Sequence, residues 1–284
     1  MTNIDQFESV FRSADKAQFV LEEVTFQRVL VVTDLDQQGA EAFVDQIQQF
    51  LQTLNRPEIK WTLLTRDDDT SIQHLLKTID DARVDLICTY RNLHLPVVEH
   101  PHSLGVHLDV LTQTTAQPVL VFPSPHRTHL SSSDCSANVV MAITDHLADQ
   151  PYLVNVAANC VGENGVLLLT HIEDKTVFDR YLRTIGRIPE IDTNIASEAI
   201  LKQLLKEPTE YIESCRERLT KSGISFRIES IVALGHHLTD YSDLIRQHDV
   251  ELLVMNTKDN DQLAMHGLAY PLSIELRDTA LMLL

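Results

Sequence analysis

The chain has 284 residues and is 44% hydrophobic, which is enough to bury the core of one or two domains. Its 41 acidic and 23 basic residues give a formal net charge of -18, and this field repels phosphate backbones and anionic headgroups, so we expect neither a nucleic acid nor a membrane as partner. The four cysteines form no CxxC pair, and neither a leader nor a membrane-spanning apolar run is recognised, which favours a soluble cytoplasmic protein.

The first 26 residues are predicted to form a helical lead-in. Phe7, Val10, Phe11 and Ala14 recur at helical spacing, and a short apolar run at residues 19–21 follows them. We expect this lead-in to pack on the first of two α/β units.

Residues 27–124 form the first predicted unit. Its apolar runs have the length and continuity of strands buried on both faces of a parallel sheet, and helical periods separate them. The four predicted strands are residues 28–33, 59–65, 84–90 and 118–122. The sequence leaves open whether a second or a third strand is missing here, and we favour loss of the edge strand, because an interior strand pairs on both sides.

A linker at residues 125–137 and a second unit at residues 138–284 complete the chain. The linker contains Ser131–Ser133 and has no sustained apolar period. The second unit has a long helical region at about residues 174–222. Its five predicted strands are residues 138–145, 166–171, 226–234, 250–256 and 280–284.

This alternation predicts an α/β fold of two tandem doubly wound, mostly parallel sheets of flavodoxin or Rossmann type, with ligands at the carboxyl ends of the strands. The apolar last strand, residues 280–284, would expose an edge that invites pairing. We expect it to pair with residues 119–122, which makes an internal pseudo-twofold dimer of the two units. Pairing between two chains, and hence a homodimer, is the alternative.

The two units share a passage in which a strand runs into a carboxylate, Val29–Asp34 and Val140–Asp145. Three further segments match successive parts of one such unit. They are Val232-Ala-Leu-Gly235, Val250-Glu-Leu-Leu-Val254, and Leu104-Gly105 ahead of Pro118-Val-Leu-Val. Together they resemble the universal stress protein family, specifically its tandem members, across residues 27–284. The resemblance implies two fused five-strand units, which in that family associate with each other.

Nucleotide-binding members of that family hold the phosphates of ATP in a Gly-x2-Gly-x9-Gly-(Ser/Thr) loop after the fourth strand. The corresponding stretches of this chain, residues 91–102 and 257–266, contain no glycine, and neither Gly105 nor Gly267 is followed by Ser or Thr. A side chain at such positions keeps the backbone away from a phosphate. We therefore expect no strong ATP site in either unit.

A degenerate pocket for ATP or another adenine nucleotide is the alternative. Asp34 and Asp145 end the equivalent first strands, where the family places a carboxylate against the adenosine, although a turn or helix cap would also explain them. The second unit is the better candidate, because Gly235 follows its third strand. The candidate pocket residues are Asp145, Thr144, His171, Gly235, Gly267, Asp34 and Gly105.

Other chemistries have weaker signals. Six of the 13 histidines cluster in one region but lack a recognised metal-binding spacing, so we expect no metal site. These histidines are His94, His100, His102, His107, His126 and His129. Ser131–Ser133 and Cys135 lie nearby without a nucleophile elbow, so no catalytic residue is assigned.

Three functions follow from these observations. The first is a non-enzymatic stress-response protein that binds a ligand or a partner. The second is an adenine-nucleotide sensor or slow ATPase that uses the pocket of the second unit. The third is an interaction module in which the helical region at residues 174–222 recruits an unknown protein partner.

Overall fold

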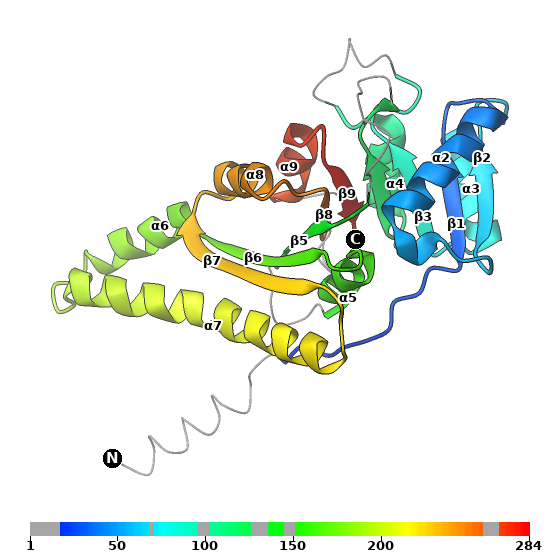
Figure 1. The fold of residues 1–284 in the computed structure, drawn as a ribbon. Coiled ribbons are helices and arrows are strands. Elements are labelled where there is room, and N and C mark those ends of the chain that lie inside the picture. The colour runs from blue at the N-terminus through cyan, green and yellow to red at the C-terminus, as the bar shows by residue number, and fades with distance from the viewer. Residues whose placement is uncertain (1–17, 69–70, 96–102, 126–135, 145–150, 258–266) are drawn as a thin grey trace.

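The computed structural model describes residues 18–68, 71–95, 103–125, 136–144, 151–257 and 267–284, which build one nine-stranded sheet with helices on both faces (Figure 1). The strands are β1 (Arg28–Val32), β2 (Lys60–Leu64), β3 (Leu86–Tyr90), β4 (Val119–Phe122), β5 (Val139–Ile143), β6 (Val166–Asp174), β7 (Arg227–Gly235), β8 (Leu252–Met255) and β9 (Ala280–Leu283). The helices are α2 (Gln37–Phe50), the short 3-10 helix η1 (Gln52–Leu54), α3 (Ile72–Ala82), α4 (Val106–Thr114), α5 (Pro151–Cys160), α6 (Lys175–Ile185), α7 (Thr193–Lys221), α8 (His237–Gln247) and α9 (Ala269–Glu275).

The strands follow from their sequences. Every residue of β3, β4, β8 and β9 is buried, as expected for apolar runs that are covered by helices on both faces of a sheet. The helices are amphipathic, and α2 buries Ala40, Phe43, Ile47 and Phe50, which recur at three and four residues. The predicted α/β class with a mostly parallel sheet is confirmed.

The strand order of the sheet is β2-β1-β3-β4-β9-β8-β5-β6-β7. The second half of the chain supplies the block β9-β8-β5-β6-β7, and the first half supplies β4-β3-β1-β2, which has the same order without its outermost strand. Within the residues that the structure describes, the position next to β2 is therefore empty. The described part of the first half thus has no counterpart of β7, the outermost strand of the other block.

The two expected sheets are joined into one. β4 and β9 pair antiparallel, with Val119 opposite Leu283 and Val121 opposite Leu281, while every other strand pair of the sheet is parallel. The expected pairing of residues 119–122 with the last strand is thus observed. It covers the apolar edge that each half would otherwise expose. We refer to this β4–β9 contact as the seam.

The expectation for the N-terminal lead-in was wrong where the structure describes it. Residues 18–26 form no helix, and residues 1–17 lie outside the described residues. The Phe19 N–H donates to the Ser214 hydroxyl of α7 at 3.1 Å, and the Asn155 amide of α5 bonds the backbone of Glu22 and Val20. The segment therefore packs on helices of the second half before it enters β1 in the first.

The long helical region at residues 174–222 is confirmed, but it is divided into α6 and α7. The Asp192 carboxylate accepts hydrogen bonds from the N–H groups of Asn194 and Ile195 and so starts a new helix. In α7 the buried residues begin only at Pro208, and the earlier half projects with α6 beyond β7 (Figure 1). In the described part of the chain, no helix is both long and apolar enough to cross a bilayer.

Candidate functional site

Asp34, which lies at the carboxyl ends of the first-half strands, accepts hydrogen bonds from other residues of the first half. The Tyr90 hydroxyl at the end of β3 donates to Asp34 Oδ1, and the His94 N–H donates to Asp34 Oδ2 at 2.9 Å. The same hydroxyl accepts the Asp34 N–H at 3.0 Å and lies 2.9 Å from Thr33 Oγ1. Burial, together with the bond to Asp34, raises the pKa of Tyr90, so the phenol stays protonated as a donor. Both carboxylate oxygens are therefore engaged.

The space beside this network is closed by two imidazoles. The rings of His94 and His107 have their centroids 4.8 Å apart, and together with Val32, Thr33 and other neighbours they line a cavity of about 10 Å³. A cavity of that size holds about one water molecule. Burial and the nearby His107 lower the pKa of His94, while Asp34 opposes this. This cavity, as described, is too small to hold a nucleotide.

Gly105 has a conformational role. Its φ is +101°, and its N–H donates to the Ser103 hydroxyl at 3.1 Å at the start of α4. Asn92 and His94 also adopt positive φ, both +61°, although neither is a glycine. The left-handed turns of this loop are thus formed largely without the glycines that would let a phosphate approach.

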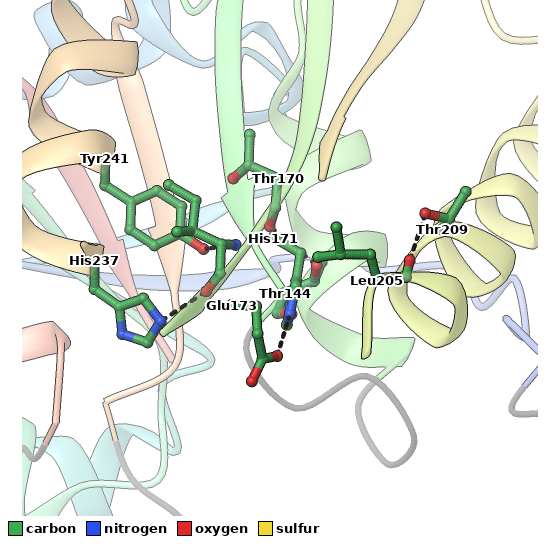
Figure 2. Close-up of polar contacts among 9 residues, drawn as sticks. Thr144, Thr170, His171, Glu173, Leu205, Thr209, His237 and Tyr241 are labelled. Carbon is green, nitrogen blue, oxygen red and sulfur yellow. Dashed lines mark hydrogen bonds and ion pairs between the residues drawn. The ribbon is translucent and has the colours of Figure 1, made fainter. Parts of the chain in front are cut away.

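In the second half, Thr144, which follows β5, and His171, within β6, lie side by side (Figure 2). The Thr144 hydroxyl donates to the Thr170 carbonyl at 3.0 Å, and His171 Nδ1 donates to the Thr144 carbonyl at 2.8 Å. Because a carbonyl only accepts, Nδ1 carries a proton, and Nε2 faces Glu173 Oε2 at 3.5 Å. The structure brings these two predicted residues together, and the hydrogen bonds of the Thr144 hydroxyl and of His171 Nδ1 are made within the chain.

Gly235 lies further along the sheet. It is opposite Asp174 in the β6–β7 register, three residues beyond His171, which is about 10 Å along a strand. A Cβ at Gly235 would lie 1.9 Å from Asp240 Oδ2, which accepts the His236 N–H at 3.0 Å. The glycine therefore leaves room for a carboxylate at the start of α8, which gives it a packing role.

Residues that the sequence did not single out tie α8 to β6 (Figure 2). The Ile172 N–H donates to the Tyr241 hydroxyl at 3.0 Å, and His237 Nε2 lies 2.6 Å from the Ile172 carbonyl. Tyr90 in the first half was missed in the same way. In both halves a tyrosine hydroxyl bonds the backbone of another element. For Tyr90 the available signal was its position at the end of β3.

Several of the residues singled out from the sequence lie outside the described residues or next to them. Asp145 lies outside them, and so do His100, His102, His126 and His129. Gly267 is described and has φ +54°, with nothing within 4 Å of the position that its Cβ would take. No group of three or more metal-ligating side chains occurs within the described ranges.

The described cysteines are buried and unreactive. Cys88, Cys160 and Cys215 are buried, and burial raises the pKa of Cys160 and of Cys215 to about 12. A thiol that stays protonated at neutral pH is a poor nucleophile and metal ligand. These cysteines act as small apolar core residues.

Comparisons with known proteins define the fold. No family model and no curated protein matches the sequence. A functionally uncharacterised protein from Pseudomonas aeruginosa PAO1 matches in structure with a TM-score of 0.53 at 12% identity, over 91% of this chain and 92% of that one. A candidate universal stress protein from Pseudomonas aeruginosa UCBPP-PA14 matches with a TM-score of 0.52 at 12% identity, over 91% of this chain and 93% of that one. The chain therefore has the fold of the universal stress protein family.

Proposed function

We propose that the chain is a universal stress protein-like protein of the stress response that binds a ligand or partner without catalysis and has no strong ATP site. The likeness in fold supports the family assignment, although a fold alone does not establish a function. The proposal that the chain has no strong ATP site is supported mainly by the hydrogen bonds that Asp34 accepts. To contact adenosine, this carboxylate would have to release Tyr90 or the His94 N–H, and the adjacent cavity of about 10 Å³ would have to open.

The test is an isothermal titration of ATP with Mg²⁺ into the tag-free protein, repeated with Asp34→Ala and Asp145→Ala. We expect no binding heat for any of the three proteins. Low-micromolar binding that persists in Asp34→Ala but disappears in Asp145→Ala would replace this proposal with a nucleotide site in the second half. Binding that only Asp34→Ala abolishes would contradict our account of the first half directly.

The second candidate is an adenine-nucleotide sensor or slow ATPase in the second half. Gly267 favours it, because a positive φ with open space around it allows a backbone N–H to approach a phosphate. If this candidate is right, heat-denatured protein releases stoichiometric adenine nucleotide, which chromatography detects. Release of ADP from protein that was loaded with ATP would distinguish the ATPase from the sensor.

The third candidate is an interaction module built on α6 and α7. Tyr181, Ile188, Ile191 and Ile195 are all at least 40% exposed, around the turn between the two projecting helices (Figure 1). Exposed apolar side chains that cluster are typical of contact surfaces. A pulldown that survives Asp145→Ala but fails in Ile188→Ser/Ile191→Ser would support this function, and unchanged capture by that variant would contradict it.

A further inference from the structure

A cavity of about 230 Å³ lies beside the seam, since Val119 of β4 and Leu283 of β9, which are paired there, both line it. The end of α4 and residues 115–119 line it from the first half of the chain. Residues 256–257 after β8, Leu283–Leu284 at the end of β9, and Tyr152 of α5 line it from the second half. Both halves of the chain are thus needed to form it, and cavities between joined units are frequent ligand sites.

The lining carries no charged side chain. Three of its hydroxyls, on Thr112, Thr115 and Thr257, already donate to backbone carbonyls at 2.7 to 2.9 Å. Their methyl groups and the surrounding apolar residues leave a largely apolar wall. Because no cationic side chain lines the cavity to offset the lost hydration of an anion, the lining disfavours a negatively charged ligand.

Three polar side chains of the lining are available to a ligand. Among the described residues, the amides of Gln117 and Asn256 and the hydroxyl of Tyr152 have no hydrogen-bond partner. Burial raises the pKa of Tyr152, so its phenol is a neutral donor and acceptor. The two amides belong to different halves of the chain, one just before β4 and the other just after β8.

We propose that this cavity binds a small uncharged ring compound that presents an amide-like edge, held by the side chains of Gln117 and Asn256. Each carboxamide offers a donor beside an acceptor, the pattern that matches a primary amide, a lactam or the edge of a nucleobase. The volume of about 230 Å³ is below the roughly 300 to 1,000 Å³ of drug-sized sites, so a single ring with one substituent is the appropriate size.

The probe is nicotinamide, compared with nicotinate, which has the same ring but a carboxylate in place of the amide. Saturation-transfer NMR on the full chain is expected to show nicotinamide bound and nicotinate not bound. In Gln117→Leu/Asn256→Leu we expect the dissociation constant for nicotinamide to rise about tenfold, since each lost hydrogen bond costs about 0.5 to 1.5 kcal/mol. Gln113→Leu is the matched control, because this exposed glutamine of α4 undergoes the same change outside the lining.

A second variant tests the cavity without changing the side chains of Gln117 and Asn256. Ala116 is exposed and lines the cavity, so Ala116→Trp is expected to fold normally, to fill the space and to abolish the nicotinamide signal. The proposal is overturned if wild-type protein does not bind nicotinamide, if nicotinate binds equally well, or if both variants bind like Gln113→Leu. None of these results depends on whether the chain binds MgATP, so the proposed function and this inference can fail separately.

Discussion

Asp34 illustrates how a residue at the end of a strand can have a structural role through its hydrogen bonds. Its two oxygens accept from the Tyr90 hydroxyl and from the His94 N–H. Asp34→Ala leaves these donors unsatisfied, so we expect the free energy of unfolding to fall by about 1–3 kcal/mol in urea denaturation. Asp45→Ala, on the exposed face of α2, should change it by less than about 0.5 kcal/mol. Equal effects of the two substitutions would exclude a special role for Asp34.

His94 makes stability depend on pH. Burial lowers its pKa, with His107 acting in the same direction and Asp34 against it, so the unfolded chain binds the proton at a higher pH than the folded chain. The stability that this contributes is present above the unfolded pKa of about 6.5 and is lost as the pH falls through the folded-state pKa.

We therefore expect the melting temperature of the wild type to fall between pH 7 and pH 5.5 by more than that of His94→Asn. Asparagine keeps the N–H that bonds Asp34 and tolerates the φ of +61° at this position. Parallel pH profiles of the two proteins, measured by thermal unfolding, would show that His94 does not contribute to this dependence.

At the level of elements, the contact of α8 with the end of β7 depends on Gly235. Gly235→Ala places a methyl group 1.9 Å from Asp240 Oδ2, so the carboxylate must move and release the His236 N–H. We expect a loss of about 1 kcal/mol in the free energy of unfolding. In an Asp240→Ala background the same change should cost much less, and a double-mutant cycle measures this difference. Additive effects of the two substitutions would mean that Gly235 is required for some other reason.

The elements that the sequence predicted well are those whose signal is local. Strands such as β3 are continuous apolar runs, and α2 repeats its apolar residues at three and four positions, so their types follow from the pattern alone. Phe19 shows the limit of this reasoning. The apolar residues around it have the spacing of a helix, but its N–H donates to the Ser214 hydroxyl, 195 positions away. A local sequence pattern cannot reveal such a distant contact.

The candidate site was predicted less completely for the same reason. Asp34 and Thr144 were identified as strand-end residues, since parallel strands end at one edge of a sheet. Tyr90, which bonds Asp34, comes from β3 and was missed, because only the register decides which side chains meet. Gly235 and His171 were expected in one pocket, and only the structure shows that the β6–β7 register places them three residues apart.

For the whole molecule, the seam implies that the two halves unfold together. β4 and β9 are buried along their full length and pair with each other, so separating the halves would expose two apolar edges. We expect a single calorimetric transition with equal van't Hoff and calorimetric enthalpies. Two resolved transitions would show instead that each half is a separate cooperative unit.

The segment before β1 should add to this coupling, because it is anchored on the second half and leads directly into the first. Phe19 is 1% exposed, and its backbone N–H is held by α7, although it belongs to no helix or strand. Phe19→Ala removes a fully buried aromatic ring, so we expect the free energy of unfolding to fall by about 3–5 kcal/mol in urea denaturation. The neighbouring Val20 is 54% exposed, and Val20→Ala should cost less than about 0.5 kcal/mol, since the Val20 carbonyl that accepts from Asn155 is kept. A loss below 1 kcal/mol for Phe19→Ala would mean that this segment lies on the surface without joining the two halves.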